Sequence, residues 1–487
     1  LVQYCKDANL DMKRTYTWMC CFCINQHRVK ATEAAGEKVP FEEFKKAFGD
    51  RVAGIGKIVA MMAPWKDPFY IKRVWCDFEM YTATSLKQEV IIAMPPKEAE
   101  DFRSSLLTGG VGEVWAALGA VKVEQAEASV PEDKERILKL IEEGPGFHHL
   151  NCAVAERLQG WIVQASEGYL KQRLKESSDG RTMDVAQLGE GVGDLLRQVC
   201  KYKESLEYLE EAKTIREEQG TLQTPEGANL LRTLGVVCFE LKNPKKALEL
   251  CEEARRIRKV TDSLETSDGA RLLSNIASML VRKYLNPKER VEGDLNQALE
   301  TYAEAKVILE ATGTLRTDEG AQLLGSEGNA YRVRKGEEDM EKAIELYKEA
   351  KAIREERGTL DTPDGARLLT GLANAKRDRQ DPEGAVETYK QARRALELTG
   401  TLCTQDGAQV LQHLGETLQN LGRNAEALQV FEQTKLIREQ TGTLDSATGR
   451  SLIMMLKKAT KSQAVIRNAG LRKGRTGGTN EDPEAPA

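Results

Sequence analysis

The chain has 487 residues, which is more than one ordinary core accommodates and predicts two or more structural units. Its formal net charge is only -5 with 30% charged residues, so the charge does not indicate attraction to nucleic acid or to a membrane surface. No apolar run approaches the roughly 20 residues that a bilayer-spanning helix needs. We therefore expect a soluble protein with neither nucleic acid nor membrane among its partners.

Ten cysteines are scattered along the chain without the paired spacing of a disulfide framework. This usage is typical of thiols in a reducing compartment and predicts a cytoplasmic protein. The first residues carry no signal-peptide pattern, and because the sequence begins at Leu1 we expect a fragment of a longer chain.

Residues 1–125 alternate between short apolar runs and helix-like segments. The apolar runs are bounded by polar or Pro/Gly segments, as buried parallel strands are, and cover residues 16–24, 55–63, 90–94 and 120–123. Helices are expected at 41–48, 74–85, 96–107 and 111–118. This order predicts an α/β domain with an open, mostly parallel sheet, whose ligand crevice lies beyond the carboxyl ends of the strands.

One motif of this region combines a carboxylate with an aromatic side chain. Trp75 and Glu79 are four residues apart, so they share one face of the helix expected at 74–85. With Arg73 they resemble the Arg-x-Trp-x-x-x-Glu pattern of heterokaryon-incompatibility domains and the Trp-Cys-x-x-Glu element of Toll/interleukin-1 receptor (TIR) domains. The segment WMCCFCINQ at 18–26 is similar to a second signature of the heterokaryon-incompatibility group.

The resemblance implies a TIR-like domain, with a fold similar to flavodoxin. In enzymatic TIR domains this Glu is the catalytic residue for cleaving NAD+, so Glu79 is a candidate catalytic carboxylate that would stabilise oxocarbenium character as the glycosidic bond breaks. Trp75 would form one wall of the pocket, and Trp65 and Asn25 would line it. NAD+ would be a substrate, and no resident cofactor is expected. The alternative is that Glu79 pairs with Arg73 or Lys72 at the start of a helix and that Trp75 and Phe78 belong to the core. The domain would then be an assembly module that self-associates.

A cluster of Cys20, Cys21, Cys23 and His27 suggests a metal site at first reading. Alternation along a strand would place Cys20 on one face and Cys21 and Cys23 on the other. We therefore expect buried thiols here, and no metal site in the chain.

Residues 126–185 are expected to form a helical connector. Helices are predicted at 131–141 and 150–174, and Gly-Pro-Gly at 144–146 separates them.

The rest of the chain is organised by one repeated stretch. The segment GTLDTPDGARLL at 358–369 returns in similar form at 220–231, 262–273, 313–324, 400–411 and 442–452. Three of the intervals between copies are 42 residues and the others are 51 and 45; the longest coincides with an insertion at 284–292. Such self-similarity predicts a solenoid whose units stack on one another.

Each copy reads as the turn between two helix pairs. Gly358 is a plausible end cap for the preceding helix, because glycine tolerates the left-handed conformation. Thr362 suits the N-cap of the next helix, and Pro363 suits its first position, which needs no backbone N–H.

Small and aromatic residues recur in the second helix of each unit. Ala343 and Ala350 permit close helix approach, and Tyr347 fills the neighbouring gap, as Tyr302, Tyr389 and Phe431 do in other units. This pattern is similar to the tetratricopeptide repeat (TPR) in the long form found in kinesin-light-chain-like proteins. The resemblance implies an all-α superhelical solenoid of about six helix pairs at 186–450, followed by a capping helix at 451–470 and a disordered tail at 471–487.

A solenoid of this kind recognises partners through its concave surface, which the first helices line. Counting from the glycine that follows Thr-Pro-Asp in the turn, leucines at +3, +4 and +7 form the core face, so +2 and +9 point away from it. These positions select the candidate peptide-binding residues Asn229, Arg271, Ser278, Gln322, Asn329, Arg367, Asn374, Gln409 and Glu416. Their amide and guanidinium groups suit a peptide backbone or acidic side chains, and the alternative is an ordinary solvated face.

The function predicted from the sequence is a protein–protein interaction scaffold or adaptor that binds partner peptides through the repeats and carries a TIR-like signalling or assembly domain. The alternative is an NAD+ glycohydrolase that uses Glu79 and is regulated by the repeat array.

Overall fold

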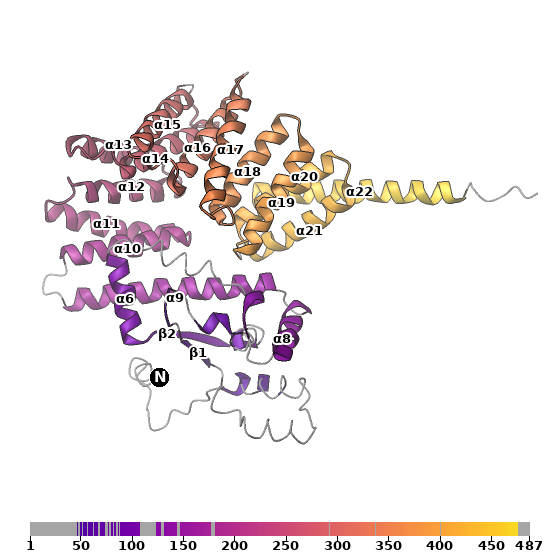
Figure 1. Ribbon diagram of the computed structural model, residues 1–487, viewed down its shortest axis with the longest axis horizontal. Coiled ribbons are helices and arrows are strands. Elements are labelled where there is room, and N and C mark those ends of the chain that lie inside the picture. Colours follow the sequence, from indigo (N-terminus) through magenta and orange to yellow (C-terminus); the bar gives the residue numbers. More distant parts are fainter. Residues whose placement is uncertain are drawn as a thin grey trace, which may run out of the picture. The chain divides into compact units, whose positions relative to one another are not determined.

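The computed structural model describes residues 181–291, 293–336, 338–399 and 401–475 continuously (Figure 1). Of the preceding part it describes residues 46, 49–50, 52–55, 57–61, 63–66, 69–73, 76, 79–80, 82–83, 86, 88–107, 123–127, 131–143 and 147–176. The chain divides into two compact units, one within residues 1–105 and 116–161 and the other within 106–115 and 162–487. None of the described helices combines the length and the apolar composition that crossing a membrane requires.

The first unit contains a small parallel sheet. Strand β1 (Lys57–Met61) pairs in parallel with β2 (Glu89–Ala93), with Lys57 opposite Glu89 and Met61 opposite Ala93. Helix α6 (Pro96–Leu107) follows with the predicted bounds. Helices α8 (Pro131–Glu143) and α9 (Phe147–Glu176) correspond to the two helices expected in the connector.

The open α/β sheet expected for residues 1–125 is not confirmed, because the described residues form only this two-stranded parallel sheet. The strand expected at 16–24 and the helix expected at 111–118 lie outside the described residues. Val123, expected to end a strand, begins the 3-10 helix η2 (Val123–Gln125) instead. The Glu124 carboxylate there accepts a hydrogen bond of 2.9 Å from Asn151 of α9. Glu127, the last described residue of this segment, forms an isolated parallel bridge with Arg73.

The second unit is an all-α solenoid, as the repeats predict (Figure 1). Residues 181–475 hold six helix pairs followed by one long helix. The helices are α10 (Met183–Gln198), α11 (Tyr202–Glu218), α12 (Pro225–Glu240), α13 (Pro244–Val260), α14 (Ser267–Leu285), α15 (Asp294–Ala311), α16 (Asp318–Arg334), α17 (Asp339–Glu356), α18 (Pro363–Asp378), α19 (Pro382–Leu398), α20 (Gln405–Asn420), α21 (Asn424–Gln440) and α22 (Ala447–Arg475). The predicted insertion is the loop between α14 and α15, and α22 extends past both bounds expected for the capping helix.

The turn between pairs has the expected cap chemistry. Gly358 has φ +68° and ends α17, while the N–H of Thr359 donates to the carbonyl of Arg354 at 2.8 Å. The Thr362 hydroxyl accepts from the N–H of Gly365 at 3.1 Å and donates to the carbonyl of Thr359 at 2.7 Å. These local contacts explain why the same residues recur at each turn.

The second glycine of the turn has a steric role that the cap pattern alone does not reveal. A Cβ atom on Gly365 would lie 1.9 Å from the carbonyl oxygen of Leu360, which no side chain can accommodate. The same distance is 1.9 to 2.1 Å at Gly227, Gly269, Gly320, Gly407 and Gly449, each facing the leucine five residues earlier. The turn therefore closes only with glycine at this position.

Small residues of one helix accommodate large residues of its partner within each pair. Tyr302, Tyr347, Tyr389 and Phe431 of the second helices are at most 2% exposed. A Cβ on Gly415 would lie 2.5 Å from the ring of Phe431, and one on Gly328 would lie 3.4 Å from that of Tyr347. The core is thus built by the small-and-aromatic pattern seen in the sequence.

Candidate functional site

A groove of about 450 Å³ crosses the middle of the solenoid and is lined from α14 to α20. Its floor is formed by Tyr302, Tyr347, Leu368 and Val410, which are at most 7% exposed. Its rim is polar and contains Ser278, Gln322, Asn329, Arg332, Arg367, Asn374 and Gln409. These floor and rim residues are called the central groove below.

Six of the nine candidate peptide-binding residues lie in the central groove, namely Ser278, Gln322, Asn329, Arg367, Asn374 and Gln409. Each belongs to the first helix of a pair, and the 42- to 51-residue spacing of the repeats brings them side by side. Glu416, Asn229 and Arg271 are not among the groove residues.

Two groove asparagines are oriented by contacts inside the protein. The Asn374 Oδ1 atom accepts from the hydroxyl of Tyr389 at 2.5 Å, and the Asn329 Oδ1 atom accepts from Nη2 of Arg332 at 3.1 Å. Because each oxygen is engaged, the remaining Nδ2 groups are hydrogen-bond donors at the groove rim. The groove therefore offers donors to carbonyl or carboxylate oxygens.

Arginines of the groove are paired with carboxylates of their own or neighbouring helices. Arg332 contacts Asp378 at 3.0 Å, and Arg282 contacts Glu240 at 2.6 Å. Arg367 pairs with Asp364 of the same helix, and both side chains of that pair are largely exposed, at 65% and 48%. Exposed pairs of this kind contribute about 0 to 1 kcal/mol, so a ligand carboxylate can replace Asp364 at little cost.

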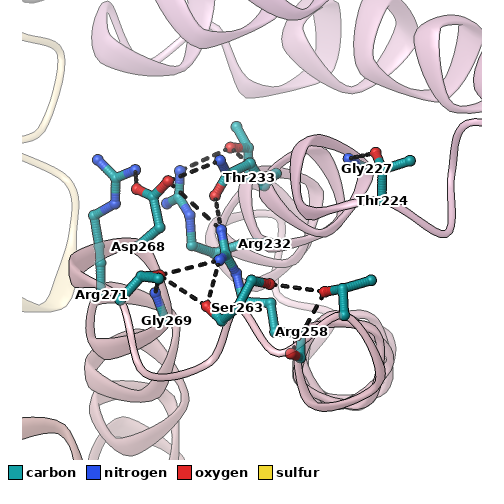
Figure 2. A network of polar contacts seen from close by, with 12 residues as sticks. Thr224, Gly227, Arg232, Thr233, Arg258, Ser263, Asp268, Gly269 and Arg271 are labelled. Carbon is teal, nitrogen blue, oxygen red and sulfur yellow. Dashed lines mark hydrogen bonds and ion pairs between the residues drawn. The ribbon is translucent and has the colours of Figure 1, made fainter. Parts of the chain in front are cut away.

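Asn229 and Arg271 belong to a different cluster, between α12 and α14. Asn229 accepts from Nη2 of the buried Arg258 at 2.8 Å and donates to Oδ2 of Asp268 at 3.2 Å. Figure 2 shows Arg271 against Asp268, with Arg232 and Arg258 close by. Burial favours the neutral form of Asp268, but the charge of Arg271 and the hydrogen bond from Asn229 outweigh it and lower the pKa of Asp268. Asn229 thus joins two repeats, and its amide is already engaged.

Glu416 belongs to a cluster at α20. It accepts from Gln412 at 3.2 Å, and it lies 3.6 Å from His413 and 3.8 Å from Arg377. Burial raises the pKa of Glu416, but the contacts with His413 and Gln412 and the charge of Arg377 lower it by more, so that the net shift is downward. Glu416 is therefore held as a carboxylate.

Several groove residues were not selected from the sequence. Arg332 and Tyr347 line the groove although neither lies at the +2 or +9 position used for selection. Gly325, Thr370 and Gly371 also line it. A comparison of equivalent positions between repeats would have pointed to Gly325, because the other five first helices have a larger residue there.

In the first unit, the Glu79 carboxylate accepts a hydrogen bond of 2.9 Å from the hydroxyl of Tyr70. Trp65 is 4% exposed, packs edge-on against Phe102 at 5.4 Å between ring centroids, and donates from Nε1 to Asp101 at 2.8 Å. This is the environment of a core residue. Trp75 and Asn25, like Cys20, Cys21, Cys23 and His27, lie outside the described residues. In the parts of the chain that are described, no three His, Cys, Asp or Glu side chains group as metal ligands would.

Two segments of the solenoid match a known repeat family. Residues 184–259 and residues 408–441 each match a family model described as tetratricopeptide repeat. The chain therefore contains tetratricopeptide repeats. A search of the curated proteins gave no significant match.

Solved structures of other repeat proteins are similar to parts of this chain. One, from Podospora anserina and described as a kinesin light chain with nearly identical TPR-like repeats, is 19% identical; the match covers 45% of this chain and 97% of that chain, with a TM-score of 0.36. A Rap protein complexed with competence and sporulation factor is 14% identical over 75% of this chain and 98% of its own, with a TM-score of 0.42. The Rap conjugation gene regulator of plasmid pLS20, solved with the Phr* peptide, is 14% identical over 79% and 97%, with a TM-score of 0.40.

Proposed function

We propose that this chain, in which tetratricopeptide repeats form the solenoid, is a protein-interaction scaffold that binds an extended peptide segment of a partner protein in the central groove. One observation carries the proposal: the polar side chains of Ser278, Asn329 and Asn374 come from three successive repeats and meet at the rim of a single groove with an apolar floor.

The groove chemistry suits a peptide main chain. The Nδ2 donors of Asn329 and Asn374 would bind backbone carbonyl oxygens, whose spacing along an extended segment is regular. Gln322 and Gln409 provide both donors and acceptors at the same rim. Arg367 would add a charge-assisted bond to an acidic side chain of the ligand, because its own ion pair is exposed and weak.

The test is selection of randomised 12-residue peptides, displayed on phage, on the full chain. Selected peptides should bind the double variant Asn329→Ala, Arg367→Ala about tenfold or more weakly, since each lost hydrogen bond contributes about 0.5 to 1.5 kcal/mol and a charged one more. Gln187→Ala is the matched control, because Gln187 is an exposed residue at the equivalent helix position of α10, outside the groove. Failure to select any peptide, or equal binding by the double variant, would refute the proposal.

The finer proposal for the first unit is a TIR-like signalling or assembly domain that self-associates. Its enzymatic alternative, cleavage of NAD+ by Glu79, stays a prediction. The bond from Tyr70 to Glu79 is compatible with either role, and the burial of Trp65 favours packing over pocket lining.

A further inference from the structure

Small residues line the middle of the central groove. The eighth and ninth residues after the N-cap of each first helix lie at equivalent positions in every repeat. They are Glu190 with Gly191 in α10, Arg232 with Thr233 in α12, Ser274 with Asn275 in α14, and Gln412 with His413 in α20. In α16 and α18 they are Gly325 with Ser326 and Thr370 with Gly371, and all four line the groove.

The two glycines that line the groove lie next to the apolar side chains of its floor. A Cβ on Gly371 would lie 2.6 Å from the ring of Tyr347, so this glycine lies directly against the tyrosine. A Cβ on Gly325 would lie 3.0 Å from a methyl group of Leu368, and no other heavy atom comes within 4 Å of it. The space beside Gly325 is thus bounded by a flexible apolar side chain and otherwise open.

We infer that the part of the central groove lined by Gly325 and Gly371, above Tyr347 and Leu368, is an anchor subsite for one large apolar side chain, aromatic or branched aliphatic, of the bound segment. The inference rests on the proposed function and adds which kind of ligand residue decides the binding. The ion pairs of Arg332 with Asp378 and of Arg367 with Asp364 lie at the rim. The floor at this place is formed by Tyr347 and Leu368.

An apolar occupant follows from the cost of the alternatives. A polar side chain placed over this floor would lose its water, and the described floor offers it no exposed partner, because the Tyr347 hydroxyl lies beneath Gly371 and its oxygen is buried. An apolar side chain gains from the same burial. Loss of that contact is expected to weaken binding by about 10- to 100-fold, the range that corresponds to burial of one large apolar side chain.

Gly325 is the better position for a test than Gly371. Its Cβ would meet only the end of the Leu368 side chain, which can change rotamer, whereas a Cβ on Gly371 would strike a buried ring. Gly325 also lies inside α16, where replacing glycine generally stabilises a helix. Gly325→Leu should therefore fold and fill the subsite, and Gly325→Ala should fill part of it. Gln187→Leu adds the same leucine at an exposed site in α10, outside the groove.

The experiment selects randomised 12-residue peptides, displayed on phage, on the full chain and measures their affinity by fluorescence anisotropy. We expect the selected peptides to share one large apolar position, and its replacement by alanine to weaken binding about 10- to 100-fold to the wild-type chain. Gly325→Leu should lose binding to a similar degree, Gly325→Ala less, and Gln187→Leu not at all, with helix content checked by circular dichroism. Peptides that lack a shared apolar position, or that bind Gly325→Leu with unchanged affinity, would overturn the subsite and leave the scaffold standing. Selection of no peptide at all would overturn the scaffold and the subsite with it.

Discussion

Replacing Glu327 by leucine should stabilise the solenoid, because Glu327 is a carboxylate at a buried position of α16. Glu327 is the tenth residue after the N-cap of α16 and only 5% exposed. The equivalent positions in the other five first helices hold Val192, Leu234, Ile276, Leu372 and Leu414, all buried. A carboxylate therefore occupies a place that the fold otherwise gives to an aliphatic side chain.

The surroundings of Glu327 compensate its charge incompletely. Its Oε2 atom is buried and has no hydrogen-bond partner among the described residues. Burial raises the pKa of Glu327 above its ordinary value of 4.5, and the charges of Lys306 and Lys342 offset this only in part. The negative charges of Glu349 and Glu310 also raise the pKa of Glu327. The charge of Glu327 in turn raises the pKa of Tyr302.

The size of the effect follows from the unsatisfied carboxylate. A buried polar group without its partner costs about 1 to 3 kcal/mol, and more when charged. Leucine would remove this cost and add apolar burial, so the free energy of unfolding should rise by about 2 kcal/mol at pH 7. Glu327→Gln is the control, because it removes the charge and keeps a polar side chain of similar shape.

The pH dependence has a definite sign. The folded-state pKa of Glu327 is raised, so the folded chain holds this proton more tightly than the unfolded chain does. Protonation of Glu327 therefore favours folding at a pH below the pKa that this group has in the unfolded chain. This contribution is lost as the pH rises through the pKa that the group has in the folded chain. The advantage of Glu327→Leu over wild type should therefore be smallest near pH 4 and increase toward pH 7. Urea unfolding followed by circular dichroism measures both the stability gain at pH 7 and its dependence on pH. The reasoning would be refuted by a Glu327→Leu variant less stable than wild type at pH 7, or by a stability difference that does not change with pH.

Three further predictions address the turn, the aromatic core and the first unit. Gly365→Ala should lower the free energy of unfolding by more than about 2 kcal/mol, because its Cβ would overlap the carbonyl of Leu360. Tyr389→Phe should destabilise the chain by about 1 kcal/mol through loss of its hydrogen bond. Tyr347→Phe should cost less or nothing, because that buried hydroxyl forms no hydrogen bond of normal geometry, although Arg332 interacts with it. Glu79→Ala should abolish NAD+ consumption by the purified chain if the domain is enzymatic, and equal rates for variant and wild type would end that hypothesis.

Each stability prediction has an internal check. Gly325→Ala is the counterpart of Gly365→Ala, since its Cβ meets only a flexible methyl group at 3.0 Å; similar losses for both would contradict the steric argument. For the tyrosines, equal destabilisation by Tyr347→Phe and Tyr389→Phe in thermal unfolding would mean that the Tyr347 hydroxyl forms a hydrogen bond in solution, with Arg332 or with a water molecule.

The solenoid could be predicted from the sequence because its turns are determined by local contacts. Thr362 and Gly358 form hydrogen bonds with residues close to them in sequence, so the local sequence pattern is enough to identify their roles. Helical periodicity selected Asn374 and Arg367, which line the groove, and their role in binding stays a prediction. Periodicity could not show that Arg258, 29 residues away in sequence, would engage Asn229.

The first unit was less predictable, since its motifs have more than one physical meaning. An aromatic residue after a strand can line a pocket or enter a core, and the sequence around Trp65 is the same in both cases. Its partners Asp101 and Phe102 lie more than 30 residues away. Short apolar runs are equally ambiguous, and Val123, which was expected to end a strand, begins a 3-10 helix.

The turns also bear on how such a chain changes its length over evolution. Each turn is closed by its own residues, as the Thr362 hydroxyl and Gly365 show, although Arg357 and Thr359 beside it also contact Asp318 of the preceding unit. Duplication or deletion of one 42-residue unit would therefore keep the closure of each turn, and would lengthen or shorten the recognition surface in whole steps. Each added unit would bring its own pair of rim positions, whose residues are free to diverge while the turn stays constant.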